Sequence, residues 1–388
     1  MRTLAGFLAA AALSLLLVPQ DAAAIPAFAR RYRVSCTTCH APFPRLKPYG
    51  EEYAGRGFAL EPGQEPARAT IDAGDDLLSL PREFPLAVRF DAFAELASKR
   101  DPRLDLQTPT VFKALTGGQI ADRVSYYTYF IIENGGEAMG LEDAWVQFTG
   151  VFGLPVDLVV GQFQICDPIV KRELRLTRED YEILRVRPGA SAVNLTYDRG
   201  LILAWHAPHG VELLAMLTNG NGIGPGTATF DDDKYKNVGL RAAAPAGPAR
   251  IGLFGSAGKA RDAASGLVNT TLYVGPDVAL ELGEHLAVSG QWLWRRDSNA
   301  SFDPASVGHL DTRGAWLEVV WLPGGPNGRT SVVLLGNKVI SDDPAAERES
   351  AALGAGYLWR RNVRVVAEAR YDWRLDQARL SLGTVLAF

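Results

Sequence analysis

The feature that most constrains this chain is an alternation of apolar and polar residues that continues from about Phe84 to the last residue. In its first stretch Leu86, Val88 and Phe90 share one face, while polar residues such as Arg89 occupy the other. A period of two is the pattern of a half-buried β-strand. The same period recurs in residues 124–132, 144–151, 158–165, 201–207, 211–217, 286–294, 315–322, 363–373 and 380–388.

The connections between these stretches alternate in length. Short turns such as 208–210, 245–247 and 360–362 take turns with long polar loops such as 219–237, 296–309 and 341–350. Short turns at one end and long loops at the other are typical of outer-membrane barrels. We therefore predict an all-β fold, a transmembrane antiparallel β-barrel of about 16 strands. An even number of strands places both ends of the barrel on the periplasmic side.

The last strand supports this prediction. Alternate residues of 380–388 are apolar, apart from Thr384, and the strand ends in the aromatic Phe388, like the signal read by the outer-membrane insertion machinery. Aromatic residues near other strand ends are expected to form interfacial girdles; they are Tyr126, Trp145, Trp321, Tyr357, Trp359 and Trp373. A soluble β-sandwich or propeller also alternates, but the chain shows no fixed repeat of the propeller kind.

Composition excludes two further classes. The chain is 47% hydrophobic, yet beyond its first residues no apolar run is long enough for a membrane-spanning helix. This excludes helical membrane proteins but not barrels, which hide their apolar face by alternation. The net charge of −4 and the lack of a Lys/Arg cluster indicate no nucleic-acid partner.

The N-terminus has the pattern of a secretory signal peptide. Arg2 supplies the positive region, Leu4 to Val18 the apolar region, and Ala22-Ala23-Ala24 the small-residue cleavage site. The apolar run is too short to span a bilayer comfortably, so we favour cleavage after Ala24 over an uncleaved anchor. The mature chain then begins at Ile25, outside the cytoplasm.

The mature N-terminus contains Cys36-Thr37-Thr38-Cys39-His40. Two thiols at this spacing can each add to one haem vinyl group, and the adjacent histidine then becomes the proximal ligand of the iron. A redox disulfide would usually belong to a thioredoxin-like βαβ unit, and a zinc site would need a second Cys or His pair nearby. Chance occurrence is a further alternative. We predict one covalent haem c on Cys36, Cys39 and His40, and we assign no role to the unpaired Cys166.

The haem segment has no obvious second iron ligand. Between Ile25 and Leu80 there is no other histidine and no methionine. By strand parity His206 faces the lumen near the periplasmic end, and Met216 faces it nearer the outer end. These two are the candidate distal ligands, and an open or weakly ligated iron is the alternative. The remaining histidines, His209, His285 and His309, fall in turns or loops.

The N-terminal segment as a set resembles a known family. The motif is preceded by Pro26-Ala27-Phe28-Ala29-Arg30 and followed by Pro44-Arg45-Leu46-Lys47-Pro48-Tyr49-Gly50 and Gly55-Arg56-Gly57-Phe58. This arrangement is similar to the N-terminal domain of the fused monohaem cytochrome–porins of the bacterial outer membrane, whose best-known members oxidise ferrous iron. The stretch from Tyr197-Asp198-Arg199-Gly200 to Thr218-Asn219-Gly220-Asn221-Gly222 resembles phosphate-selective-type porins in pattern. From the family only Cys36, Cys39 and His40 carry over as functional residues.

These observations give three regions and a function. We predict a signal peptide in residues 1–24, a monohaem cytochrome c-like plug in 25–80 and a porin-like barrel in 81–388. The resemblance implies electron transfer across the outer membrane, from an extracellular donor such as Fe(II) to a periplasmic cytochrome or other carrier, so the chain could act as an Fe(II) oxidase. The alternatives are a passive diffusion porin with a haem plug, or a haem enzyme acting on a small oxidant such as peroxide. A metal-attracting role for the acidic runs 231–233 and 342–343 is a weaker hypothesis than simple solvation.

Overall fold

The computed structural model describes residues 27–32, 34–60, 70–71, 74, 80–81, 84–134, 140–223, 231, 233–306 and 308–388. The predicted signal peptide, residues 1–24, lies outside the described residues, as does part of the predicted plug region 25–80. In the latter region β1 (Thr70–Ile71) pairs with β2 (Leu80–Pro81) in a small separate sheet.

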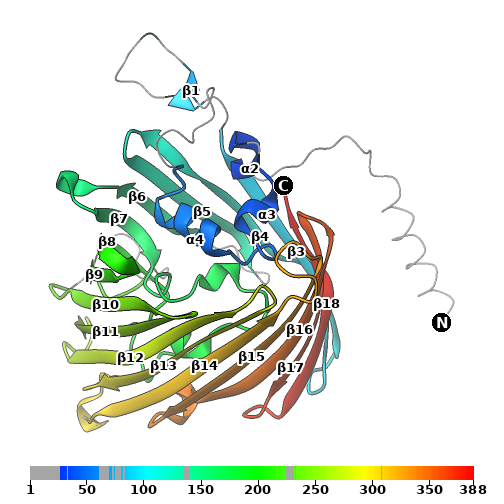
Figure 1. The fold of residues 1–388 in the computed structure, drawn as a ribbon. Helices are drawn as coiled ribbons and strands as arrows, with labels where there is room; N and C mark the ends of the chain where they lie inside the picture. The colour runs from blue at the N-terminus through cyan, green and yellow to red at the C-terminus, as the bar shows by residue number, and fades with distance from the viewer. Residues whose placement is uncertain are drawn as a thin grey trace.

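Among the described residues, strands β3 to β18 form one closed antiparallel barrel of sixteen strands (Figure 1). Each strand pairs with its neighbours in sequence, and β18 closes the barrel on β3, from Arg379 opposite Ala97 to Ala387 opposite Arg89. The bounds are β3 Leu86–Ala97, β4 Leu104–Ala121, β5 Val124–Asn134, β6 Leu141–Phe148, β7 Val156–Gln164, β8 Tyr197–His206, β9 Glu212–Thr218, β10 Asn237–Ala246, β11 Ala249–Arg261, β12 Val268–Leu282, β13 Leu286–Asp297, β14 Leu310–Trp321, β15 Thr330–Ser341, β16 Arg348–Arg360, β17 Val363–Asp372 and β18 Gln377–Ala387. The predicted fold class and strand number are confirmed.

The alternation in the sequence separates residues that point into the lumen from residues that point to the outer surface of the barrel. In β12 the inward Thr271 and Tyr273 are buried, whereas the outward Leu272 and Val274 are exposed. Outward leucines from many strands are exposed in the same way, which leaves an apolar outer surface that only a bilayer can cover. No helix in the described part of the chain has the length and apolarity to cross a membrane.

The predicted aromatic girdle is correct in part. Trp321, Tyr357, Trp359 and Trp373 are exposed on the outer surface. Trp145 is an exception, because it lies on the inward face of β6 and packs against Phe58 of the N-terminal segment, with ring centroids 6.2 Å apart. Parity along a strand decides the direction of a side chain, and proximity to a strand end does not.

Three short helices of the N-terminal segment lie in the end of the barrel that carries the short turns (Figure 1). They are α2 (Ala27–Tyr32), α3 (Cys36–Cys39) and α4 (Pro48–Gly55). We call residues 27–60 the plug. Ala41 packs with Val320 and Leu322 of the barrel, and Phe43 packs against a second apolar cluster of the barrel wall. The plug therefore contacts the lumen on several sides.

A second segment occupies the lumen, and the sequence pattern did not predict it. Residues 165–196, between β7 and β8, fold inward from the long-loop end; we call them the strap. The strap contains the 3-10 turn η2 (Arg172–Leu174) and the helix α5 (Glu182–Arg185). The other 3-10 turns lie in connections: η1 Val151–Gly153, η3 Pro208–Gly210, η5 Pro304–Ser306 and η6 Pro344–Ala346.

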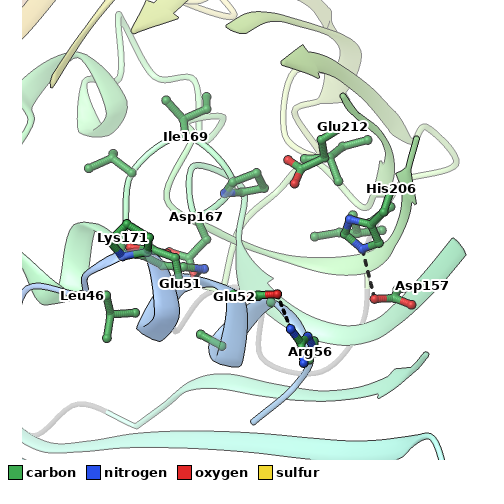
Figure 2. A pocket seen from close by; sticks show the side chains of 18 of the residues that line it. Leu46, Glu51, Glu52, Arg56, Asp157, Asp167, Ile169, Lys171, His206 and Glu212 are labelled. Carbon is green, nitrogen blue, oxygen red and sulfur yellow. Dashed lines mark hydrogen bonds and ion pairs between the residues drawn. The ribbon is translucent and has the colours of Figure 1, made fainter. Parts of the chain in front are cut away.

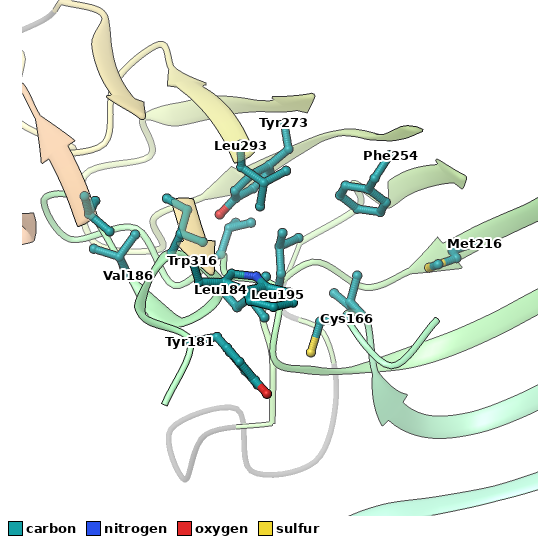
Figure 3. Packing of buried hydrophobic residues seen from close by; sticks show 14 of the residues in the cluster. Cys166, Tyr181, Leu184, Val186, Leu195, Met216, Phe254, Tyr273, Leu293 and Trp316 are labelled. Atoms are coloured by element: carbon teal, nitrogen blue, oxygen red, sulfur yellow. The ribbon is translucent and has the colours of Figure 1, made fainter. Parts of the chain in front are cut away.

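The strap crosses the lumen because its two faces suit different parts of the wall. Apolar strap residues such as Leu184 pack against inward aromatic and aliphatic residues of β9 and of β11 to β15, including Trp316 (Figure 3). Charged strap residues reach β3 and β4: Arg178 pairs with Glu95 at 3.1 Å, and Glu173 pairs with Lys113 at 3.1 Å. Distant strands are thereby tied together across the barrel.

Candidate functional site

The Cys-x-x-Cys-His motif begins on a single helical turn. Ser35 caps this turn, because its side chain accepts a hydrogen bond from the Thr37 amide, and α3 spans Cys36–Cys39. Both thiols are free and partly buried. Burial raises the pKa of each thiol above its usual value.

The histidine of the motif is held in one orientation. His40 Nδ1 lies 2.8 Å from the Pro44 carbonyl oxygen. Because a carbonyl only accepts, Nδ1 carries the proton and Nε2 keeps the lone pair that a metal needs. Burial lowers the pKa of His40, so the ring stays neutral. A neutral imidazole fixed through Nδ1 is the form in which histidine binds iron.

The loop after the motif folds back on it. The Ala41 amide donates to the Arg45 carbonyl at 3.0 Å, and the Lys47 amide donates to the Cys39 carbonyl at 2.9 Å. Gly50 of α4 then packs directly on Cys39, where an added Cβ would lie 2.3 Å from the carbonyl oxygen. Only glycine permits this approach, so the position of α4 depends on Gly50.

The residues present fit a covalently bound haem c. Two free thiols stand one helical turn apart, and the adjacent imidazole is neutral and oriented through its other nitrogen. A bare metal ion is a poorer match, since the described residues contain no group of three or more His, Cys, Asp or Glu side chains arranged to hold one. When bound, haem would supply a one-electron carrier at Cys36, Cys39 and His40.

Aromatic side chains fasten the plug to the barrel wall. Phe58 stacks on Phe28 within the plug at 4.8 Å and meets Tyr127 of β5 at 4.9 Å and Trp145 of β6 at 6.2 Å. Gln147 of β6 adds a hydrogen bond of 2.7 Å to the Gly55 carbonyl. Sequence reasoning missed these contacts. The inward parity of Tyr127 and Trp145 was the signal that could have indicated them.

His206 faces the lumen, as predicted. It lines a cavity of about 1450 Å³ that plug residues such as Leu46 and Glu52 also line (Figure 2). Its Nε2 lies 3.2 Å from Asp157 Oδ2, which fixes the ring against β7. His40 is not among the residues that line this cavity.

Met216 also points inward, as predicted, but it is only 3% exposed and lies in the apolar cluster beneath the strap (Figure 3). Cys166 belongs to the same cluster, and burial raises the pKa of its thiol. Among the described residues, neither His206 nor Met216 shares a hydrogen bond, ring contact or apolar cluster with His40. The described contacts therefore do not place either candidate distal ligand against His40.

His285 and the acidic run 231–233 have local structural partners. His285 Nδ1 lies 2.8 Å from the Leu322 carbonyl oxygen. Asp231 pairs with Lys236, and Asp233 accepts hydrogen bonds from the Tyr235 and Arg261 amides. The acidic run therefore serves to order its own loop, with Asp232 outside the described residues.

Comparison with solved structures identifies the architecture. The fold is similar to that of the anion-selective porin from Comamonas acidovorans, with a TM-score of 0.60 and 11% identity over 79% of this chain and 99% of that chain. The barrel has the porin fold. OmpT of Vibrio cholerae matches with a TM-score of 0.56 and 9% identity, over 82% and 99% of the two chains. DcaP, an outer-membrane channel of Acinetobacter baumannii, also matches at 0.56, with 10% identity over 78% and 96%.

At these identities the likeness establishes the fold alone. No protein-family model matches the sequence, and the comparison with curated proteins found no relative. The porin fold accounts for the barrel, whereas the chemistry of the plug depends on its own residues.

Proposed function

We propose that this protein is an outer-membrane barrel that transfers electrons through one covalent haem c, bound by Cys36, Cys39 and His40. The observation that carries the proposal is the His40 geometry: a neutral imidazole, held through Nδ1 next to two free thiols, placed inside the mouth of a porin fold.

The placement of the plug supports a direction for the path. Both ends of the barrel lie at the short-turn end, which in outer-membrane barrels faces the periplasm. The plug would then present the motif to a periplasmic cytochrome or other soluble carrier. The donor, an extracellular reductant such as Fe(II), would approach from the long-loop end. His40 and the two cysteines hold the redox group, and the aromatic contacts of Phe58 keep it at a fixed position in the lumen.

A passive diffusion channel is the second candidate, and the porin fold itself favours it. Two features of the lumen weigh against free diffusion: the plug occupies the short-turn end, and the strap crosses the barrel with paired charges. A haem enzyme that acts on a small oxidant is the third candidate. It would need an open sixth position on the iron, which is compatible with the lack of a described contact between His40 and either distal candidate.

One experiment separates the three candidates. Outer-membrane protein produced in a host with c-type haem assembly is titrated with Fe(II) while its optical spectrum is recorded. We expect a c-type spectrum that is reduced by Fe(II) and reoxidised by a soluble cytochrome c. Solute flux through reconstituted liposomes without haem reduction would favour the channel, and turnover of peroxide would favour the enzyme. A protein without covalent haem would overturn the proposal.

A further inference from the structure

The outer surface of the barrel is hollowed near the place where the barrel closes. A groove of about 630 Å³ crosses β15 to β18 and the end of β3. The strands β18 and β3 pair directly and lie side by side (Figure 1). We call this hollow the closure groove. It lies toward the long-loop end, because it includes Ala97 at the end of β3 and Ala378 near the start of β18.

The closure groove is formed by small outward residues between large ones. In one row across the strands, Ala369 lies between Leu353 and Leu380, each of which is 54% exposed. In the next row toward the long loops, Ala351 and Ala378 are also small. Because alanine covers little of the backbone, the neighbouring leucines become the walls of the groove. This shape suits a narrow apolar ligand such as a hydrocarbon chain.

The mouth of the closure groove is held in place by bonds between two loops. The Tyr371 hydroxyl and the Lys99 ammonium both donate to the Asp376 carboxylate. The Ser98 hydroxyl accepts a hydrogen bond of 3.0 Å from the Ala378 amide. These bonds join the loop between β3 and β4 to the loop between β17 and β18. The mouth is therefore part of the folded wall, and not a gap between separate loops.

A cation without a counter-charge lies at this mouth. Arg103 is exposed and lines the groove, and its guanidinium has no hydrogen-bond or ion-pair partner among the described residues. In the same loop, Arg100 is paired with Asp105 at 3.3 Å. The exposed Trp373, one residue beyond β17, indicates that this end of the groove lies at the membrane interface. A guanidinium at that depth can bind a lipid phosphate through two parallel hydrogen bonds.

We infer that the closure groove binds an anionic membrane lipid, with an acyl chain along Ala369 and the headgroup phosphate on Arg103. The apolar rows bind the hydrocarbon chain, and the unpaired cation selects a negative headgroup. This inference goes beyond the proposed function and does not depend on a haem. A second copy of the barrel is the competing occupant, but the apolar rows alone would suffice for it, and Arg103 would have no role.

The test counts the lipid molecules that the full-length protein retains in detergent, by native mass spectrometry. The probes are phosphatidylglycerol, which is anionic, and phosphatidylcholine with the same acyl chains, which has no net charge. We expect the wild-type protein to bind phosphatidylglycerol about tenfold more tightly, which corresponds to about 1.4 kcal/mol. Arg103→Gln should remove this preference and leave phosphatidylcholine binding unchanged. Ala369→Trp should fill the groove and weaken binding of both lipids about tenfold.

Each substitution has a matched control. Arg100→Gln removes an arginine from the same loop that is already paired, so the lipid preference should remain. Ala257 is an exposed outward alanine of β11 that lies between Val238 and Leu272, outside the closure groove. Ala257→Trp should therefore leave the binding of both lipids unchanged. Faster migration of unheated samples on a gel confirms that each variant still forms the barrel.

Three results would overturn the inference. Equal losses of lipid with Ala369→Trp and Ala257→Trp would show that the lipid contacts the barrel all round and has no site. A preference for phosphatidylglycerol that survives Arg103→Gln would refute the role of the cation. Loss of a multimeric mass with Ala369→Trp, without any loss of lipid, would assign the groove to a second copy of the chain.

Discussion

The plug and the strap both fill the lumen, but they are held there by different interactions. The plug rests on aromatic contacts around Phe58 and a few hydrogen bonds, such as the one from Gln147 to Gly55. The strap is fixed by buried charge on one face and by an apolar cluster on the other. Both segments have buried polar atoms without a hydrogen-bond partner among the described residues, such as Arg31 Nε in the plug and Arg175 Nε in the strap. The difference between the two segments is thus that aromatic packing holds the plug, whereas ion pairs and apolar packing together hold the strap.

The charge on the strap illustrates this point. Burial alone would raise the pKa of Glu173, but Lys113, Arg172 and Arg175 around it outweigh that effect and hold its pKa below the usual value. A group with a depressed pKa contributes stability above its unfolded pKa, about 4.3, and loses it only as the pH falls through the lower folded value. The strap should therefore remain locked in acid that protonates ordinary glutamates.

The largest expected effect is the loss of covalent haem from the plug without loss of the barrel fold. Cys36→Ala/Cys39→Ala should abolish covalent haem, because both thioether bonds are lost, while the barrel still forms. Haem staining on a denaturing gel measures covalent haem, and the mobility of unheated protein on a gel measures barrel formation. Cys166→Ala is the matched control, since this thiol is buried at the start of the strap, and it should leave the haem in place. Haem retained by the double variant would contradict the site.

The next effect concerns how the wall holds the strap. Arg295 is fully buried, donates to the Val186 and Val193 carbonyls at 3.1 and 2.9 Å, and pairs with Asp297. Arg295→Ala leaves a buried carboxylate unpaired, and we expect a loss of about 3–5 kcal/mol in the free energy of unfolding. Denaturant unfolding and hydrogen exchange of the strap measure it.

The neighbouring Arg296 provides the control for this substitution. It is exposed and pairs with Asp311 at the surface, so Arg296→Ala should change stability little. If the two substitutions have equal effects, the buried charges do not hold the strap, and the contrast with the plug fails.

The sequence predicted the barrel but not the strap, for a physical reason. Strands that separate lipid from lumen must alternate apolar and polar residues. Stretches such as 286–294 and 380–388 can therefore be recognised as strands from the sequence alone. The strap has no such constraint. Its apolar Leu184 and its charged Arg178 are chosen to fit partners on distant strands, so apolar and charged residues follow each other in the strap without a period. Trp145 was misread for a different reason, because its position near a strand end was used in place of its parity, which directs it into the lumen toward Phe58. The site followed a similar rule. The motif identified Cys36, Cys39 and His40 as candidates, whereas the wall residues Tyr127 and Trp145 gain meaning only from their contact with Phe58 of the plug.

A smaller effect tests how the plug is anchored. Phe58 is half-buried between Phe28 and the wall residues Tyr127 and Trp145. Phe58→Ala should weaken plug docking by about 2 kcal/mol, less than for a fully buried phenylalanine. Plug amides should then exchange faster, while those of the strap should not change. Phe152→Ala is the control, because this side chain is 95% exposed. Equal acceleration in plug and strap would show that the two segments unfold together.

The smallest expected effect is a change in the haem spectrum and potential, and it concerns the sixth ligand of the iron. The comparison of plug and strap decides which of the two candidate ligands to expect. His206 lines the same cavity as plug residues, whereas Met216 belongs to the strap cluster. Met216→Leu conserves volume and should cost less than about 1.5 kcal/mol, so it tests the thioether without releasing the strap.

We expect His206→Ala to shift the haem absorption spectrum and potential, and Met216→Leu and the loop control His309→Ala to leave both unchanged. A thioether raises the potential relative to a second imidazole. A fall in potential with Met216→Leu would therefore show that the thioether binds the iron and that the strap cluster opens when the haem is present. No shift with either substitution would leave the iron five-coordinate or bound to water. The plug would then hold an open site, and the reaction with a small oxidant would become the better function for it.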